Sequence, residues 1–446
     1  MNVKELEKIK NKVFEDAKSI LENNRVDLNG DSYTKPAPKL YPFQWNWDSG
    51  FMAYGYSHYD TGKAIAELRS LFKGQWSSGF LPHIIFHKKA EGYFPNYDFW
   101  NTAEISKYAP KDLHTSGITQ PPLHAVVVWH IYEIINKTDQ EKAKNFLKEF
   151  FPKLLKLHEY FYTKRDPEGS GMITIYHPWE SGFDNSPRWD APLNNVIVGD
   201  IPKYERFDTK FVSPKFRPTD AEYDKYVYLA NELKKKNYND ALIYKDHPFK
   251  VKDKVLSSIL CLANRKLELM AEVLSEDSSN IKEWTKRFEK SLMEIMWCEE
   301  HKLFYDFDVV ANKQIRVRTV GSLIPIMTGL LSKEQIEEMT VHLDKVNFCG
   351  NKSCKLGLLP SAGFHEHEFN HEQYWRGPIW ININWFLYKG FLINDMKDRA
   401  ESMKIHILRL IQESGFWEYY SPIDGKGLGS ENFSWTAALA IDLLYE

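Results

Sequence analysis

Residues 176–192 read Tyr-His-Pro-Trp-Glu-Ser-Gly-Phe-Asp-Asn-Ser-Pro-Arg-Trp-Asp-Ala-Pro. This stretch holds three carboxylates, Glu180, Asp184 and Asp190, with two tryptophans and an arginine. Three prolines and Gly182 interrupt it, so it is predicted to be a loop rather than a helix or strand. Indole rings beside carboxylates suit a sugar, whose C–H faces pack on rings and whose hydroxyls need acceptors. A structural loop with its rings in the core is the alternative interpretation.

Three further stretches combine aromatic and polar residues in the same way. They are Tyr-Pro-Phe-Gln-Trp-Asn-Trp-Asp-Ser-Gly-Phe at 41–51, Glu-Gln-Tyr-Trp-Arg-Gly-Pro-Ile-Trp at 372–380 and Gly-Ser-Glu-Asn-Phe-Ser-Trp at 429–435. Long helical patterns separate these stretches along the chain. We therefore expect the four loops to meet in one sugar-binding pocket.

The composition limits the classes of function. The 446 residues carry a net charge of -3, which gives no electrostatic reason to expect nucleic acid or an anionic membrane as partner. Aromatic residues make up 15% of the chain, a load that fits a stacking site for a small-molecule ligand. The N-terminal sequence is charged and lacks an apolar signal region, and no stretch is long enough to span a membrane. We therefore expect a cytoplasmic protein; its oligomeric state is not encoded in any visible pattern.

Helical periodicity dominates the chain and predicts an all-α fold. Phe51–Tyr59 is expected to be part of an early helix, after the first aromatic loop. Further helices are predicted at 3–21, 61–72, 122–135, 140–162, 253–274, 281–296, 334–343, 380–392, 397–412 and 435–445. About twelve helices with few strands suggest helical hairpins closed into an α/α toroid, formed by residues 1–446 as a single domain. The segments 74–115 and 193–237 interrupt the pattern and are predicted to form a cap or lid over the pocket.

One motif suggests a metal, but its context argues against this. His367-Glu-Phe-Asn-His371 matches the H-E-x-x-H pattern of zinc proteases, which requires a helix and a further ligand downstream. Gly363 and the Gly377-Pro378 pair leave little room for such a helix. Cys349 and Cys354 could join these histidines in a structural site, although the spacing matches no known pattern. We expect no metal and no cofactor.

The aromatic loops resemble the short bacterial branch of glycoside hydrolase family 63, which contains mannosylglycerate and glucosylglycerate hydrolases. The resemblance runs from Tyr41 to Trp435. It rests on the combination Tyr-Pro-x-Gln-Trp-x-Trp-Asp, Trp-Glu-Ser-Gly-x-Asp-Asn-Ser-Pro-Arg-Trp and Tyr-Trp-Arg-Gly-Pro-x-Trp. It implies an (α/α)6 barrel and hydrolysis of an α-glycoside with inversion.

The resemblance also implies the catalytic pair. It assigns Asp184 as the general acid and Glu431 as the general base. Inversion needs one carboxylic acid to protonate the leaving oxygen and one carboxylate to activate water, about 6.5–9.5 Å apart. Apolar tryptophan walls beside Asp184 would raise the pKa of the acid. Glu180 and Asp48 are alternative carboxylates, of which Asp48 suits sugar hydroxyls better.

Further residues are expected to contact the substrate. The sugar subsite is expected to contain Tyr41, Trp45, Trp47, Asp48, Tyr374, Trp375 and Trp380, with Trp179 and Glu180 contributed by the central stretch. The resemblance implies a glycerate clamp at Arg217 and Tyr223, with Tyr93 and Gln120 as additional contacts. Arg217 offers a bidentate fork to a carboxylate. The alternative is an ion pair of Arg217 within its own acidic loop.

Other functions stay open at this point. A trehalase-like or α-glucosidase enzyme acting on neutral α-disaccharides would use the same barrel. A sugar isomerase or epimerase would use histidines for proton transfer, and a sugar-binding protein would need no catalytic carboxylates. The choice between glucose and mannose depends on the orientation of one hydroxyl, which the sequence does not decide.

Overall fold

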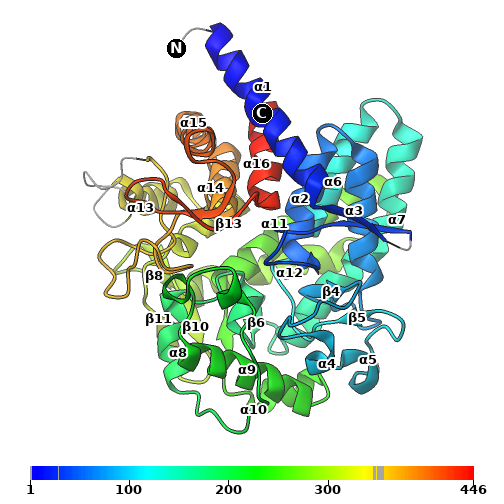
Figure 1. The fold of residues 1–446 in the computed structure, drawn as a ribbon, viewed down its shortest axis with the longest axis vertical. Coiled ribbons are helices and arrows are strands. Elements are labelled where there is room, and N and C mark those ends of the chain that lie inside the picture. The colour runs from blue at the N-terminus through cyan, green and yellow to red at the C-terminus, as the bar shows by residue number, and fades with distance from the viewer. Residues whose placement is uncertain (1–2, 29, 345–347, 349–355) are drawn as a thin grey trace.

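The computed structural model describes residues 3–28, 30–344, 348 and 356–446 (Figure 1). Cys349 and Cys354 lie outside the described residues. The α-helices are α1 Val3–Asn24, α2 Asn46–Ser57, α3 Thr61–Lys73, α4 Tyr97–Trp100, α5 Thr102–Ile105, α6 His124–Asn136, α7 Gln140–Tyr160, α8 Asp190–Asn194, α9 Asp220–Lys235, α10 Asp240–Asp246, α11 Lys254–Leu274, α12 Ser279–Ser291, α13 Lys333–Asp344, α14 Ile381–Ile393, α15 Lys397–Ser414 and α16 Ser434–Tyr445. The predicted long helices are therefore present.

The strands are short and belong to small antiparallel sheets between the helices. They are β1 Arg25–Leu28, β2 Asp31–Thr34, β3 Gln44–Trp45, β4 Ile84–Phe86, β5 His114–Thr115, β6 Thr174–Ile175, β7 Val251–Lys252, β8 Trp297–Cys298, β9 Leu303–Phe304, β10 Asp306–Asp308, β11 Lys313–Ile315, β12 Trp417–Tyr420 and β13 Gly427–Glu431. The strand orders are β3-β4-β5 and β11-β10-β7-β6, with β1-β2, β8-β9 and β12-β13 as two-stranded pairs. These strands do not form the core; they hold the loops at the ends of the helices.

The long helices form an inner and an outer ring. The inner ring runs from α16 to α2, α6 and α11, continues through the 3-10 turn Ile324–Thr328, and returns through α14 to α16. On the outside, α1 packs on α16, α3 on α2, α7 on α6, α12 on α11 and α15 on α14, so that the first helix closes the ring against the last (Figure 1). This alternation is a toroid of helical hairpins.

Sequence explains which helices are inside. Every residue of α2 is buried, as is most of α14 and α16, because these helices are apolar on all sides. The outer helix α12 instead buries Ile281, Trp284 and Phe288, which share one face at helical spacing, and exposes charged residues elsewhere. The pattern of apolar positions therefore determines the layer in which each helix lies.

Two local predictions are wrong in detail. Helix α2 begins at Asn46, so half of the first aromatic stretch is helical rather than loop. Its start is favoured by Asp48, an acidic residue in the first turn. The stretch 176–192 contains the 3-10 turns Pro178–Ser181 and Pro187–Trp189, followed by α8. Proline begins both 3-10 turns, since its missing N–H is not needed in a first helical turn.

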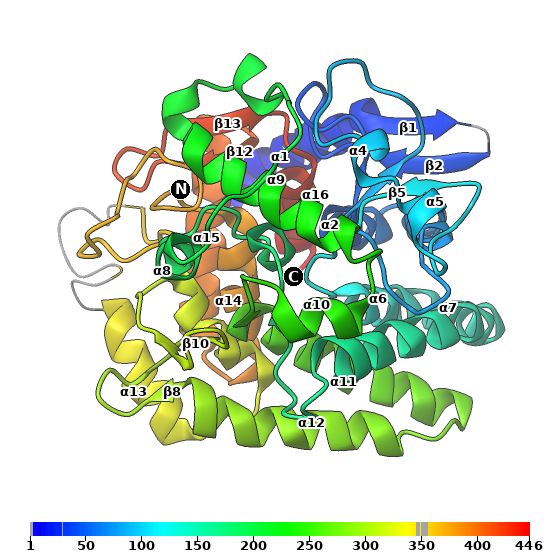
Figure 2. The same ribbon diagram turned by 90° about the horizontal axis from the view of Figure 1, so that it is seen from below.

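The segments 74–115 and 193–237 contact one another. In segment 193–237, the Lys234 ammonium donates to the Phe99 carbonyl oxygen at 2.7 Å. Two aromatic pairs also join the segments, Phe94 with Tyr204 and Tyr93 with Phe207, with ring centroids 5.0 and 5.1 Å apart. Figure 2 shows α4 and α9, one from each segment, on the near side of the molecule. The two segments therefore pack against each other.

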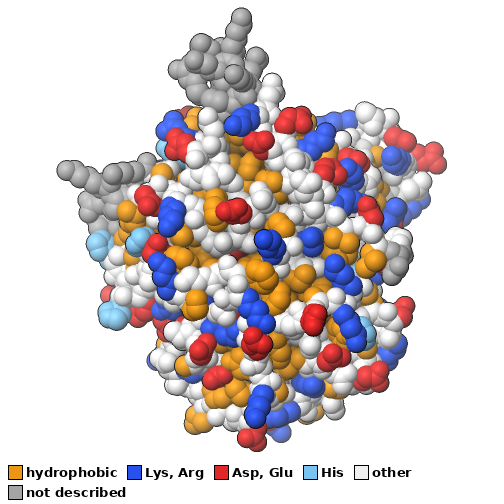
Figure 3. All heavy atoms as spheres, in the orientation of Figure 1, with side chains coloured by type: hydrophobic (Ala, Val, Ile, Leu, Met, Phe, Trp, Pro, Cys, Tyr) orange, Lys and Arg blue, Asp and Glu red, His pale blue; other side chains and the backbone are white. Residues whose placement is uncertain are grey.

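The surface carries charged side chains of both signs (Figure 3), in agreement with the small net charge of the sequence. On the face in Figure 3, basic and acidic side chains are interspersed, with no large field of either sign. Among the described residues, no helix is both long and apolar enough to cross a membrane.

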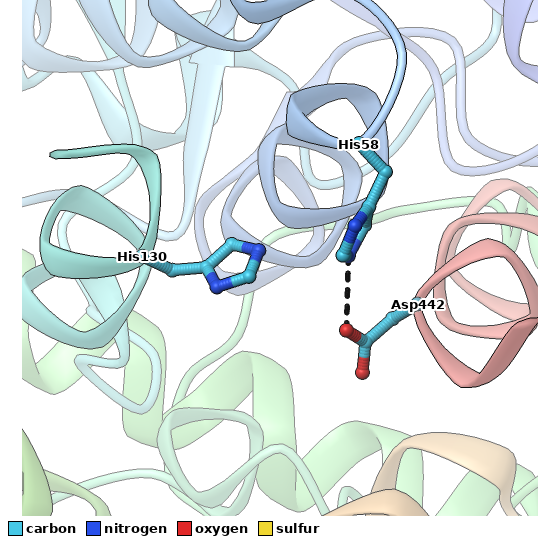
Figure 4. A group of neighbouring side chains, drawn as sticks. All are labelled: His58, His130 and Asp442. Atoms are coloured by element: carbon cyan, nitrogen blue, oxygen red, sulfur yellow. Dashed lines mark hydrogen bonds and ion pairs between the residues drawn. The ribbon is translucent and has the colours of Figure 1, made fainter. Parts of the chain in front are cut away.

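A buried polar group links α2, α14 and α16 near the closure of the ring. Asp442 Oδ1 lies 3.0 Å from His58 Nε2, and Oδ2 accepts from Trp385 Nε1 at 2.6 Å and lies 3.0 Å from Lys389 Nζ. His130 of α6 faces the same carboxylate (Figure 4) and stacks on Tyr54 with ring centroids 3.9 Å apart. The Lys389 ammonium already supplies the positive charge that Asp442 needs. We therefore interpret this group as a structural link between helices rather than a metal site.

Replacing Asp442 tests this interpretation. Asp442→Asn should lower the free energy of unfolding by about 3 kcal/mol, because it removes the carboxylate from a buried ion pair and leaves Lys389 with less compensation. Chemical denaturation would measure the loss. The control Glu413→Gln changes an exposed carboxylate of α15 and should stay within about 0.5 kcal/mol of the wild type. Equal stability of the two variants would show that the link contributes nothing.

Candidate active site

The central loop, residues 176–192, reaches the barrel axis through a tight turn. His177 Nδ1 accepts a hydrogen bond from the Trp179 amide at 3.1 Å and thereby caps the first 3-10 turn. The turn ends at Gly182, whose φ is +75° and where a Cβ atom would lie 2.4 Å from the Trp47 ring. Only glycine allows both this backbone conformation and this approach. The turn brings Asp184 next to the aromatic residues of α2.

Glu180 holds the central loop in place. Its two carboxylate oxygens accept from Arg165 at 2.8 and 2.9 Å, and Oε2 also accepts from the Tyr176 amide at 2.7 Å. The side chain is fully buried and does not line the cavity described below. Glu180, a predicted substrate contact, is thus not among the residues that line this cavity, and its charge is compensated inside the protein.

The other charged residues of the loop are paired as well. Arg188 lies 2.9 Å from Asp306 and 3.2 Å from Asp253, with all three side chains buried. Asp190 makes a bidentate ion pair with Arg376, at 2.9 and 2.5 Å. Of the three carboxylates in the loop, Asp184 alone makes no ion pair within the described part of the chain. It is the carboxyl group that the loop leaves available.

A cavity with two connected chambers lies at this end of the barrel. The barrel-side chamber is lined by Pro36, Tyr41, Trp45, Trp47, Asp48, Gln120, Gly182, Asp184, Tyr374, Trp375, Glu418, Phe433 and Trp435. The cap-side chamber is lined by Leu40, Tyr41, Trp45, His83, Ile84, Tyr93, Phe94, Pro95, Gln120, Trp179, Asp184, Phe207, Asp208, Arg217, Pro218, Tyr223 and Tyr374. Asp184 lines both chambers, as do Tyr41, Trp45, Gln120 and Tyr374, so the two chambers adjoin at these residues.

Three carboxyl groups line the barrel-side chamber, and burial raises the pKa of each. The pKa of Asp184 rises to about 7, chiefly through desolvation and against the opposing effects of Arg217 and a hydrogen bond from Tyr374. Burial also raises the pKa of Asp48 well above its usual range, and that of Glu418 more moderately, since Arg217 and Tyr41 oppose the shift. Asp184 can therefore hold a proton near neutral pH.

Glu418, rather than Glu431, is the glutamate at the cavity. Glu418 on β12 is buried, accepting from the Tyr41 hydroxyl at 2.7 Å and from the Ser430 amide at 3.1 Å. Glu431 on the neighbouring strand β13 is exposed and pairs with Trp417. The pairing of β12 with β13 is irregular between Trp417 and Tyr419, and of the two glutamates only Glu418 lines the cavity.

The structure therefore corrects the placement expected for Glu431. The missed residue had a signal in the sequence. Glu418 is flanked by aromatic residues in Phe-Trp-Glu-Tyr-Tyr, a strand-like run in which an acid on the inward face is unusual.

Arg217 contacts the same carboxylate. Its Nη2 lies 3.3 Å from Glu418 Oε2, and both terminal nitrogens lie 3.3 Å from the Tyr41 hydroxyl. The guanidinium packs over the Tyr374 ring at 4.3 Å, and Nε is buried without a hydrogen-bond partner in the described residues. An ion pair exists, as the alternative interpretation expects, but its acid lies 201 residues further along the chain.

Most of the predicted aromatic residues line the cavity. Trp380 is the exception. It is buried behind Trp375, parallel to it at a centroid distance of 3.7 Å, and its Nε1 donates to the Tyr374 carbonyl oxygen at 3.0 Å. Trp380 therefore supports the wall from behind. Phe433 and Trp435 line it as well, as expected for the stretch 429–435, whereas His83, Phe207 and Asp208 are lining residues that sequence analysis missed besides Glu418.

Comparison with known proteins agrees with this geometry. Residues 41–436 match the sequence model described as the mannosylglycerate hydrolase MGH1-like glycoside hydrolase domain. The chain belongs to this glycoside hydrolase family. It is 38% identical to the mannosylglycerate hydrolase of Rubrobacter radiotolerans, over 93% of both chains, and 36% identical to the glucosylglycerate hydrolase of Mycolicibacterium hassiacum, over 92% of this chain and 94% of the relative.

A solved structure shares the fold. The glycoside hydrolase family 63 mannosylglycerate hydrolase of Thermus thermophilus, in complex with Tris and D-glycerate, superposes with a TM-score of 0.89 at 39% identity. The match covers 97% of this chain and 99% of that one. The neutral trehalase of Saccharomyces cerevisiae is similar in fold alone, with a TM-score of 0.57 at 16% identity. The predicted (α/α)6 barrel and the predicted enzyme class, a glycoside hydrolase, are both confirmed.

The H-E-x-x-H segment of this glycoside hydrolase is not helical. Residues 364–375 form successive turns, and the His367 side chain is 96% exposed. The two histidines therefore do not share a helical face, which zinc binding by this motif requires. The prediction of a loop is confirmed.

Chelation tests the role of this segment. Exhaustive dialysis against a chelator should leave the hydrolase activity unchanged, because no step assigned to the cavity residues needs a Lewis acid. The double change His367→Ala with His371→Ala should behave in the same way. Activity that is lost on chelation and returns with zinc would contradict this interpretation.

Proposed function

We propose that the protein hydrolyses the α-glycosidic bond of a hexosyl-glycerate, mannosylglycerate or glucosylglycerate, with inversion. The observation that carries this proposal is the place of Asp184. It lines both chambers, with the aromatic chamber containing Glu418 on one side and the chamber containing Arg217 on the other. A glycoside with its sugar in the barrel-side chamber and its aglycone in the cap-side chamber would have its scissile oxygen beside Asp184.

Asp184 and Glu418 suit the two proton transfers. Asp184, whose pKa of about 7 keeps a substantial protonated fraction, would donate to the glycosidic oxygen as the C1–O bond breaks. Glu418 would remove a proton from water while the water oxygen bonds to C1 from the opposite face. The products are the inverted hexose and glycerate, and exchange with solvent restores both carboxyl groups.

The barrel-side chamber favours a hexose. Trp47, Trp375 and Trp435 provide ring faces, while Asp48 and Gln120 offer hydrogen-bond partners for hydroxyl groups. Tyr41 and Tyr374 lie at the boundary, with their hydroxyl oxygens 3.3 Å apart. Sugar subsites commonly combine stacking faces with a few fixed polar groups, and this lining has both.

The cap-side chamber favours a small acidic aglycone. Arg217 lines this chamber, and its terminal nitrogens make only contacts of 3.3 Å with Glu418 and Tyr41, which leaves the guanidinium hydrogen-bonding capacity for a carboxylate. Tyr93, Trp179 and Tyr223 surround the rest of the chamber. The names of the relatives support glycerate, as does the D-glycerate in the Thermus thermophilus complex. We also propose that 1–446 is one catalytic domain, with segments 74–115 and 193–237 as its cap.

A hydrolase of neutral α-disaccharides is the second candidate. The similarity to trehalase is one of fold alone and does not favour this candidate over the first. A buried arginine in the aglycone chamber would have no carboxylate to bind in such a substrate. The two candidates differ in one measurement, the ratio of kcat/KM for a glycosylglycerate to that for a neutral α-disaccharide.

One prediction of the proposed function concerns the catalytic pair. Asp184→Asn and Glu418→Gln should each lower kcat by about a hundredfold or more, the usual scale for removing one proton-transfer group. Glu431→Gln is the matched control, a neighbouring glutamate that is exposed, and should keep near-normal turnover. The measurement is release of hexose from glucosylglycerate and mannosylglycerate. A loss in Glu431→Gln with full activity in Glu418→Gln would reverse the assignment of the base.

Another prediction of the proposed function concerns the anomeric configuration of the released hexose. Because water is activated on the face opposite the leaving group, an α-linked substrate should release the β-anomer first. Proton NMR of the anomeric signals, recorded before mutarotation, would identify it. Initial release of the α-anomer would indicate a covalent glycosyl-enzyme intermediate and exclude the role of Glu418 as a general base.

A further inference from the structure

Arg217 contacts the proposed base and lines the proposed aglycone chamber at the same time. Its contacts with Glu418 and Tyr41 are each 3.3 Å, longer than the 2.7–2.9 Å typical of charge-assisted hydrogen bonds. Both charged side chains are nearly fully buried, at 3% and 1% exposure. The pair is thus a buried but loose ion pair, and the guanidinium retains hydrogen-bonding capacity for a second carboxylate.

Two hydrogen bonds hold the backbone at Arg217. The Tyr374 amide donates to the Phe216 carbonyl oxygen at 3.1 Å, and Gln373 Nε2 donates to the Arg217 carbonyl oxygen at 3.4 Å. These bonds join the cap segment to the loop that carries Tyr374 and Trp375. A ligand in the cap-side chamber would therefore meet a guanidinium that is anchored at its backbone and packed over the Tyr374 ring.

We propose that the carboxylate of the substrate competes with Glu418 for Arg217, so that an acidic aglycone activates the catalytic pair as well as binding to it. This inference rests on the proposed function. With the chamber empty, the positive charge of Arg217 stabilises ionised Glu418 and makes it a weaker base. A glycerate carboxylate on the same guanidinium offsets that charge, and Glu418 becomes the stronger acceptor for a proton from water.

The same compensation affects the acid. Arg217 is the largest influence that opposes the raised pKa of Asp184. Offsetting its charge raises that pKa further, so the acid stays protonated at higher pH. The charge of this one guanidinium thereby affects the pKa of both Asp184 and Glu418, and offsetting it shifts both pKa values in the direction that hydrolysis requires. With a neutral aglycone, the charge of Arg217 would still lower the pKa of both carboxyl groups. Acidic substrates would therefore be favoured in the rate of hydrolysis as well as in binding.

An α-glycosyl fluoride with free D-glycerate separates these effects. The fluoride fills only the barrel-side chamber and its leaving group needs no general acid, so its hydrolysis reports on the base. D-glycerate should accelerate fluoride hydrolysis by the wild type at pH 7 about threefold or more, saturably, as expected for a base strengthened by about one pKa unit. Glycerol, of similar shape but without the carboxylate, should not accelerate it.

The pH profile supplies a second measurement that a purely structural role would not move. Activity on the fluoride falls as pH drops through the pKa of the base. Bound glycerate raises that pKa, so the acidic limb should move to higher pH by about one unit. Arg217→Gln should abolish both the acceleration and the shift, and Arg217→Lys should retain part of each. Lys215→Gln, an exposed position two residues away, is the matched control and should retain both in full.

The outcomes distinguish the two proposals. If glycosylglycerates are hydrolysed but glycerate fails to accelerate the fluoride, or only inhibits it, the coupling through Arg217 is wrong while the proposed function stands. If no glycosylglycerate is hydrolysed, the proposed function itself is wrong. The comparison of glycerate with glycerol uses the wild type alone, so it remains decisive even if the Arg217 variants do not fold.

Discussion

The burial of charge around residues 176–192 is the constraint on which the rest of the site depends. Removing an ionised group from water costs several kcal/mol unless a partner of opposite charge compensates it. Arg165 compensates Glu180, while Asp253 and Asp306 compensate Arg188, and these partners come from α7's continuation, the start of α11 and β10. Because the pairs connect separate hairpins of the barrel, they hold the loop in place although its own regular elements are only two 3-10 turns and the short helix α8. Asp184 is left unpaired in a dry environment, and this is the condition for a raised pKa.

The aromatic residues serve two purposes that their sequence does not separate. Trp47, Trp375 and Trp435 line the cavity, whereas Trp380 lies behind Trp375 as a parallel support. The support matters because a ring that stacks on a sugar must keep its position when the chamber is empty. Burial of Trp380 also stabilises α14, since it immediately precedes that helix and its Nε1 closes the preceding loop onto it. The wall of the site and the core of the barrel are therefore the same packed layer.

Sequence was a good guide to the barrel and a partial guide to the site. The apolar pattern predicted the long helices, because burial of a continuous face determines them. It failed at α2, where residues with a binding role also begin a helix, and at Pro178 and Pro187, which start turns instead of preventing them. Composition identified the substrate-facing rings but could not tell Trp375 from Trp380. The proposed base was missed for a similar reason: Glu418 and Glu431 belong to paired strands, and the fold of these strands determines that Glu418 is the buried one.

Charge balance relates the acid's proton to the choice of substrate. Asp48, Asp184 and Glu418 line one chamber, and Arg217 is the only arginine or lysine among the described residues that line either chamber. Asp208, the remaining carboxylate of the cap-side chamber, is paired with Arg206. If the other three carboxyl groups were all ionised, an incoming carboxylate would add a fourth unpaired negative charge against a single guanidinium, in a medium that screens poorly. Protonation of Asp184 and Asp48, both of whose pKa values are raised, lowers that excess. Asp184, the proposed acid, must be protonated to donate its proton. The same protonation lowers the negative charge that an anionic aglycone meets as it enters. An enzyme for acidic glycosides can therefore favour the reactive state of its own acid through the binding of its substrate.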